Sequence, residues 1–140
     1  DSETGRRLEI YDVALHPTDP MQAFTATSAG LFQSSDGGAT WTQCRKGLSK
    51  GWLNSVVFDP NQPQVVFAAQ LGRIFQSEDG GRSWALFDSD GLDGVWVKHL
   101  AVSVGDNPGL LAVSSSRGVY VRAGDLSRPA ALNHAPASAR

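Results

Sequence analysis

The stretch SSDGGATW (Ser34–Trp41) recurs 43 residues later as SEDGGRSW (Ser77–Trp84). Each octet follows a short apolar-polar run, residues 30–33 and residues 73–76. An Asp-Gly-Gly sequence beside such a run predicts a β-hairpin, because glycine readily adopts the positive φ that tight turns require. We expect each octet aspartate to accept hydrogen bonds from amides of its own turn, and each closing tryptophan to be buried beside the hairpin.

The composition predicts a globular chain. Its 140 residues suffice for one domain with a core, and 41% are hydrophobic while 19% are charged. A net charge of −2 argues against a nucleic-acid or anionic-membrane binder, and no apolar run approaches the ~20 residues of a membrane helix. Cys44 is the single cysteine, which excludes an internal disulfide, and no Cys/His cluster has zinc spacing. We expect no cofactor and no membrane insertion.

The repeat extends well beyond the octets. Pro17 and Pro60 are also 43 residues apart, and a third copy begins near Val97 but has no octet. Each copy has short apolar runs separated by turn residues, which predicts strands. The predicted strands are residues 9–15, 22–27, 30–34, 40–44, 53–58, 64–69, 73–77, 83–87, 96–102, 110–114 and 118–122, and an outer strand after residue 122 is left open. Four strands in ~40–50 residues are typical of a β-propeller blade.

The octets resemble the Asp-box (BNR-type) repeat. The matching residues are Ser34, Asp36, Gly38, Thr40 and Trp41, then Ser77, Asp79, Gly81, Ser83 (in place of Thr) and Trp84. Asp-box propellers include sialidases, xyloglucanases, sortilin and photosystem II assembly factors. The resemblance implies an all-β partial propeller of about three four-stranded blades, with the box residues as structural locks away from the ligand face. It also implies an extracytoplasmic (periplasmic or secreted) location.

We expect blades at about 8–50, 51–93 and 94–125, with a tail or linker over 126–140. Closed propellers have ~4–8 blades, so three blades are too few. Further blades would come from the same chain, a homo-oligomer or another subunit, and two copies would give six. The chain opens on Asp1 without a signal peptide. We therefore expect a processed or excised piece that lacks its targeting segment.

Antiparallel strands place the octet turns on one face of the molecule and the links between blades on the opposite face. The binding candidates on that opposite face are Arg45, Lys46, Lys50, Trp52, Arg73, Trp96 and Arg117. Aromatic rings near cationic groups suit sugar stacking or a protein hot spot. The alternative is that both tryptophans pack between blades and the basic residues are merely solvated.

No catalytic residue is assigned. Sialidase-like chemistry would need an arginine cluster and a Tyr–Glu pair, and the only glutamates are Glu3, Glu9 and Glu78. The acidic cluster Asp88, Asp90 and Asp93 loosely resembles a calcium loop but lacks the spaced ligands and the closing Glu of an EF-hand. A solvated loop between blades is the other interpretation. His16, His99 and His134 have no partner at ligand or triad spacing.

These observations favour a non-catalytic interaction module that acts as a scaffold, assembly factor or accessory subunit, with a protein partner. The alternative is a fragment of a secreted carbohydrate-active Asp-box enzyme (glycosidase or sialidase-like), or a glycan-binding module. The two differ in whether paired carboxylates stand on other blades.

Overall fold

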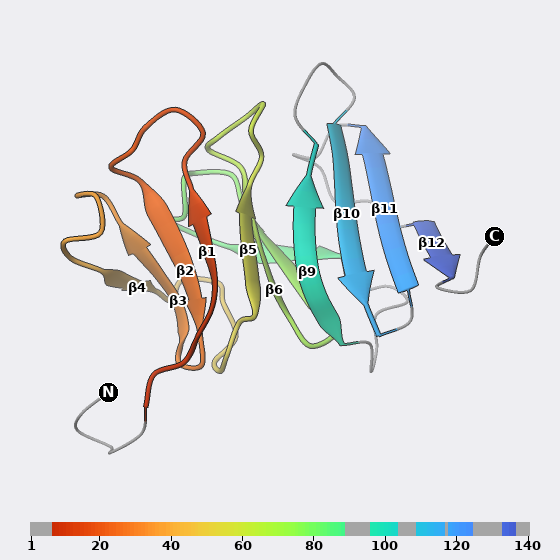
Figure 1. The fold of residues 1–140 in the computed structure, drawn as a ribbon, viewed down its shortest axis with the longest axis horizontal. Coiled ribbons are helices and arrows are strands. Elements are labelled where there is room, and N and C mark those ends of the chain that lie inside the picture. Colours follow the sequence, from red (N-terminus) through yellow and green to blue (C-terminus); the bar gives the residue numbers. More distant parts are fainter. Residues whose placement is uncertain (1–6, 89–95, 104–108, 117, 125–132, 137–140) are drawn as a thin grey trace.

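The computed structural model describes residues 7–88, 96–103, 109–116, 118–124 and 133–136, and these are all strand, turn or loop. They form three antiparallel four-stranded sheets, each with its strands in sequence order (Figure 1). We call the sheets blades 1, 2 and 3. The all-β fold and the three blades are as predicted. Within the described residues no helix is long and apolar enough to cross a membrane.

The strand bounds lie close to those predicted. Blade 1 consists of β1 (Ile10–Leu15), β2 (Ala23–Thr27), β3 (Gly30–Ser34) and β4 (Thr42–Cys44). Blade 2 consists of β5 (Ser55–Phe58), β6 (Val66–Gln70), β7 (Arg73–Ser77) and β8 (Ala85–Asp88). Blade 3 consists of β9 (Val97–Val102), β10 (Gly109–Ser115), β11 (Gly118–Gly124) and β12 (Asn133–Pro136).

The strand β12 differs from the prediction. Residues 126–140 were expected to form a tail or linker, but Asn133–Pro136 pair antiparallel with β11, Tyr120 opposite His134. The expectation rested on the Pro- and Ala-rich composition of this segment. The free edge of β11 offers backbone donors and acceptors to any extended segment, so this pairing does not require an apolar alternation in β12.

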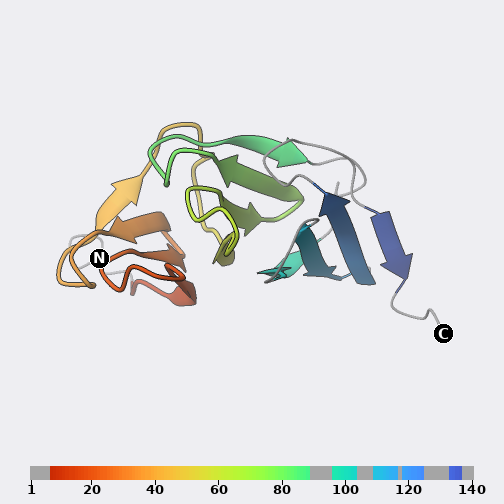
Figure 2. The same cartoon turned by 90° about the horizontal axis from the view of Figure 1, so that it is seen from above.

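The blades fan out in an arc (Figure 2), with β1, β5 and β9 as the inner strands. Two apolar clusters fill the spaces between blades. The first contains Phe24 and Leu31 of blade 1 with Val56 and Trp84 of blade 2. The second joins blade 2 to Val97, Leu100 and Tyr120 of blade 3. Alternate residues of β6 enter different clusters, because successive side chains of a strand point to opposite faces.

The two octets form the same hydrogen-bonded turn. The Asp36 carboxylate accepts bonds from the Thr40 amide (2.9 Å) and hydroxyl (2.5 Å), and from the Ser34 hydroxyl (2.8 Å). Asp79 accepts the equivalent bonds, at the same distances, from Ser83 and Ser77. The two glycines of each octet have positive φ, between 73° and 97°. The predicted aspartate-locked hairpin is therefore confirmed in both copies.

The prediction that both octet tryptophans are buried is correct for Trp84 and wrong for Trp41. Trp84 is 6% exposed, whereas Trp41 is 41% exposed. Each indole donates to the carbonyl of its own octet, Trp41 to Gly38 and Trp84 to Gly81, both at 3.1 Å. The difference comes from the neighbouring blade: Trp84 packs edge-on against Phe24 of blade 1, with ring centroids 6.0 Å apart. Within the described chain, no blade precedes blade 1 to do the same for Trp41.

Candidate functional site

The octet turns and the inter-blade links lie at opposite ends of the blades, as the strand directions predict. Each octet contacts the loop between the first two strands of its blade: Gly37 donates to the Met21 carbonyl, and Gly80 to the Gln64 carbonyl. At the other end, the link after β4 faces the turn between β2 and β3, and the amide of Leu53 donates to the Thr27 carbonyl. The candidate binding residues belong to this second end.

Three aromatic rings from successive repeats meet at the link end. Trp52 and Trp96 lie with ring centroids 4.9 Å apart at 35°, and Tyr11 contacts Trp52 edge-on at 6.4 Å. Together with Asn54 and Lys98, these residues line a groove of about 510 Å³, which we call the aromatic groove. Tyr11 and Trp96 are exposed, and Trp52 is half-buried. The two tryptophans therefore line an open surface instead of packing inside the core between blades.

Backbone contacts fix the tryptophans in place. The Trp96 amide donates to the Ser116 hydroxyl (3.1 Å), and the Ser116 amide donates back to the Trp96 carbonyl (3.0 Å). The Trp52 carbonyl accepts a bond from the Gln70 side chain (3.3 Å). Each tryptophan is thus tied to the turn between the second and third strands of its own blade. The backbone at each ring is therefore already ordered, so a ligand that covers the rings need not order it.

Asn54 joins blade 2 to blade 3 below the rings. Its side-chain amide donates to the carbonyls of Val97 and Lys98. Its Oδ1 atom is buried, and it is the one buried side-chain polar atom of the described residues that has no hydrogen-bond partner. An unpaired buried acceptor costs ~1–3 kcal/mol. Because this atom is buried, it is not accessible to a ligand in the groove.

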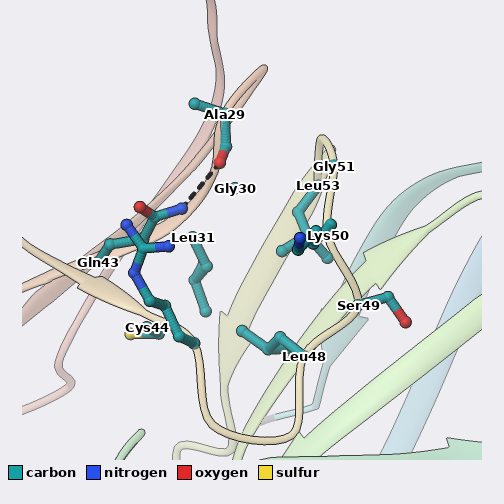
Figure 3. Close-up of a pocket in the computed structure, with 11 residues that line it drawn as sticks. Ala29, Gly30, Leu31, Gln43, Cys44, Leu48, Ser49, Lys50, Gly51 and Leu53 are labelled. Atoms are coloured by element: carbon teal, nitrogen blue, oxygen red, sulfur yellow. Dashed lines mark hydrogen bonds between the residues drawn. The ribbon is translucent and has the colours of Figure 1, made fainter.

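The basic candidates lie apart from the tryptophans. Arg45 and Lys50 line a different pocket of about 240 Å³, bordered by Gly30, Gln43 and Leu48 (Figure 3). Arg73 donates to the Ser49 hydroxyl at 3.0 Å, and the Lys46 carbonyl accepts the Trp84 amide at 3.0 Å. Arg117 lies outside the described residues. The structure thus brings Trp52 and Trp96 together. Of the described basic candidates, none lines their groove, whose lysine is Lys98.

Three groove residues were not singled out from the sequence. Tyr11, Asn54 and Lys98 hold the same position in successive repeats, 43 and 44 residues apart, just as Trp52 and Trp96 are 44 apart. Aligning the repeats on the inner strands would have found them. The signal is weak, because the three residue types share neither charge nor shape and only the position recurs.

Four ionisable groups of the described residues have perturbed pKa values, and two of them, Tyr11 and Cys44, lie outside the octets. Donation from the Tyr11 hydroxyl to Glu9 raises the pKa of Tyr11, with smaller effects of desolvation and of the Glu9 charge. Burial raises the pKa of the Cys44 thiol to about 11, so this half-buried cysteine is not a thiolate nucleophile at neutral pH.

The octet aspartates have pKa values lowered to about 2. For Asp36 the main cause is the hydrogen bond from the Thr40 hydroxyl, followed by the Thr40 amide and the Ser34 hydroxyl. For Asp79, desolvation raises the pKa, but the bonds from Ser83 and Ser77 outweigh it. Both carboxylates are therefore ionised turn locks and not proton donors.

The other polar candidates form no second site within the part of the chain that the structure describes. Asp90 and Asp93 lie outside the described residues, and for Asp88 only its place in β8 is described. The described residues contain no group of three His, Cys, Asp or Glu side chains that could hold a metal ion. His16 accepts bonds from the amides of Thr18 and Asp19 and packs against Phe58, which gives it a structural role in its loop.

Solved structures with this fold are β-propeller proteins. The GH74 enzyme of Niastella koreensis matches with a TM-score of 0.65 and 26% identity, over 79% of this chain and 19% of that chain. YCF48 bound to D1 peptide matches with a TM-score of 0.71 and 18% identity, over 94% of this chain and 42% of that chain. The extracellular domain of the hybrid two-component system BT4673 from B. thetaiotaomicron matches with a TM-score of 0.69 and 21% identity, over 91% of this chain and 16% of that chain.

The present chain therefore spans less than half of each of these three proteins. Neither the protein-family models nor the curated protein sequences give a match. The neighbours include both an enzyme and a peptide-bound protein. The likeness therefore supports the propeller fold for this chain and does not assign it an activity.

Proposed function

We propose that this chain is a non-catalytic propeller module that binds a protein partner through the aromatic groove, as a scaffold, assembly factor or accessory subunit. The contact between Trp52 and Trp96, contributed by two different blades, is the observation that carries the proposal. Tryptophan and tyrosine are the side chains most enriched at protein-binding hot spots, because they combine a large apolar area with a polar tip.

The composition of the groove suits an extended peptide. Its rings offer flat apolar contact, and Lys98 offers a cation. The groove is lined by Tyr11, Trp52 and Trp96, which come from three successive repeats. YCF48, which shares the fold over 94% of this chain, is bound to a peptide. That likeness supports a peptide partner here without identifying it.

Selection from a displayed random-peptide library tests this function. We expect the wild-type chain to enrich specific peptides. In fluorescence anisotropy, Trp52→Ala or Trp96→Ala should raise the dissociation constant of these peptides by ~10-fold or more, as loss of a hot-spot ring does. Leu86→Ala removes an equally exposed apolar side chain from β8, away from the groove, and serves as the matched control. No enrichment, or equal binding by all variants, would contradict the proposal.

A glycan-binding module, or a fragment of a carbohydrate-active enzyme, is the second candidate. Paired aromatic rings also suit sugar stacking, and the GH74 enzyme is 26% identical over the matched region. Binding to an oligosaccharide panel separates the two functions. Saccharide binding that Trp52→Ala abolishes, with no peptide enriched, would favour this candidate.

We further propose that the two octets are Asp-boxes of the BNR type and that the protein works outside the cytoplasm. The identical hydrogen bonds of the two octets support the first point. The extracellular domain among the structural neighbours supports the second. Cell fractionation with an antibody to this chain tests the location, and recovery in the cytoplasmic fraction would contradict it.

A further inference from the structure

Equivalent residues of blades 1 and 2 differ sharply in burial. We call the side of a blade that faces the preceding blade its leading face, and the opposite side its trailing face. On the leading face of blade 2, four apolar residues are at most 6% exposed: Leu53, Val56, Phe58 and Trp84. The same repeat positions in blade 1 are at least 41% exposed: Ile10, Val13, Leu15 and Trp41. The leading face of blade 1 is therefore an uncovered copy of a buried interface.

The interface between blades 1 and 2 shows what covers such a face. Phe24 packs edge-on against Trp84, and the Gln33 side chain donates to the Gly80 carbonyl at 2.8 Å. The Asp12 carboxylate accepts the Val56 amide at 3.0 Å. Thus the trailing face of one blade covers both the octet and the inner strand of the next.

The interface between blades 2 and 3 repeats this polarity. The Leu100 amide donates to the Ser55 hydroxyl (3.0 Å), so Ser55 takes the place that Asp12 has one blade earlier. In blade 1, by contrast, the Val13 amide donates to Asp12 beside it in the same strand. The amides of Val56 and Leu100 thus bond to the preceding blade, whereas the equivalent amide in blade 1, that of Val13, bonds within its own strand.

Blade 3 leaves the complementary face uncovered. Leu31 and Ile74 hold one position of the trailing face in blades 1 and 2, and both are fully buried. Val119 holds that position in blade 3 and is 41% exposed. Ala101 is likewise exposed, whereas Ala14, its equivalent in blade 1, is buried. One chain therefore carries both halves of the inter-blade interface, one at each end of its arc (Figure 2).

We propose that the leading face of blade 1 binds the trailing face of blade 3 of a second copy of this chain. The contact continues an interface that the chain already forms twice internally, and it joins two different surfaces. A contact between two different surfaces produces a closed ring when the rotations between successive subunits add up to a full turn. Two copies joined by two such contacts would make a ring of six blades. Six lies within the range of ~4–8 blades that close propellers. This surface is separate from the aromatic groove.

Charge substitutions on the two faces test the proposal. We expect the wild-type chain to sediment at twice the monomer mass in analytical ultracentrifugation. Leu15→Glu and Val119→Glu should each raise the dimer dissociation constant by ~100-fold or more, because each would bury an unpaired carboxylate. Both side chains are exposed in the single chain, so folding should survive, which circular dichroism checks. Leu86→Glu, in the internal blade 2, should leave the dimer intact.

A mixing experiment distinguishes this contact from other dimers. The Leu15→Glu chain keeps its trailing face, and the Val119→Glu chain keeps its leading face. An equimolar mixture should therefore form a heterodimer through one intact interface, while each variant alone stays monomeric. A contact between two leading faces would be insensitive to Val119→Glu, and that result would overturn the proposal. So would a wild-type chain that stays monomeric at ~100 µM, well above the dissociation constant of a specific interface; the face would then belong to a blade other than blade 3 of a second copy.

Discussion

At the scale of single residues, the octet aspartates link the turn geometry to pH. Asp36 and Asp79 each accept a hydroxyl and an amide bond from the residue four positions later. Their pKa values in the folded chain are about 2, below the ~3.9 of an unfolded aspartate. A lowered folded pKa contributes stability that is fully present above the unfolded pKa and is lost as the pH falls through the folded pKa.

We therefore expect the free energy of unfolding to decrease as the pH falls from ~4 to ~2. Urea unfolding at a series of pH values measures this change. Asp79→Asn removes the ionisable group and keeps an acceptor, so its unfolding free energy should depend less on pH over this range. If the unfolding free energy of the wild-type chain does not change over this pH range, or changes as much as that of the variant, the ionised aspartates do not stabilise the turns as described.

Cys44 offers a second residue-scale prediction. With its pKa raised to about 11 by burial, the thiol is almost entirely protonated at pH 8. Iodoacetamide should alkylate it ~100-fold more slowly than an unstructured cysteine, because the thiolate is the reacting form. Mass spectrometry follows the reaction, and urea should restore a normal rate. Rapid alkylation of the folded chain would show that the thiol is not buried as described.

At the scale of elements, the same hairpin has two different surroundings. Trp84→Ala should lower the free energy of unfolding by ~3–5 kcal/mol, the usual cost of deleting a buried aromatic ring. Trp41→Ala should cost less than ~1 kcal/mol, as surface changes do. Both are measured by urea unfolding in a Leu15→Glu background, so that association does not contribute. Equal costs would mean that the neighbouring blade does not decide the burial of these rings.

The octet glycines give a parallel comparison. Gly38 and Gly81 both have positive φ, 89° and 97°, so alanine is strained at either position. A methyl group at Gly81 would also lie 2.5 Å from the Phe24 ring, whereas at Gly38 it meets only Trp41 of its own octet, at 3.6 Å. Gly81→Ala should therefore cost at least ~1 kcal/mol more than Gly38→Ala, through the added overpacking. Thermal unfolding compares the two, and equal melting temperatures would contradict the close approach.

Local patterns predicted the elements well. The strands of blades 1 and 2 begin and end within about two residues of their expected bounds, because glycine turns and alternating apolar residues act over short distances. The prediction that Trp41 is buried was wrong, because its burial depends on a neighbouring blade and not on the octet itself. The strand Asn133–Pro136 was missed because edge pairing uses the backbone and leaves little trace in side chains.

The candidate site was predicted only in part. Trp52 and Trp96 were found by their matched spacing, and the structure places them in contact. Lys98 shares their groove because it follows Trp96 by two residues in the same repeat. Arg45 and Lys50 instead line the pocket beside the link after β4, and neither their charge nor their spacing shows this in the sequence.

At the scale of the whole molecule, the groove and the uncovered faces depend on one arrangement. The inner strands are linked in series, since Asp12 bonds to Ser55 and Ser55 bonds to the Leu100 amide. Because each groove ring comes from a different repeat, the groove exists only if the blades pack in this order. The burial of the tryptophans reports directly on that packing, since Trp84 lies between blades and Trp41 lies on a bare face.

Hydroxyl-radical footprinting of the four tryptophans, read by mass spectrometry, measures this packing most directly. In the Leu15→Glu chain we expect rapid oxidation of Trp41 and Trp96, slower oxidation of Trp52, and protection of Trp84. In the wild-type chain Trp41 should become protected as the second copy covers it. Equal oxidation of Trp41 and Trp84 in the Leu15→Glu chain would show that blade 2 is not packed on blade 1 and would contradict the fold described.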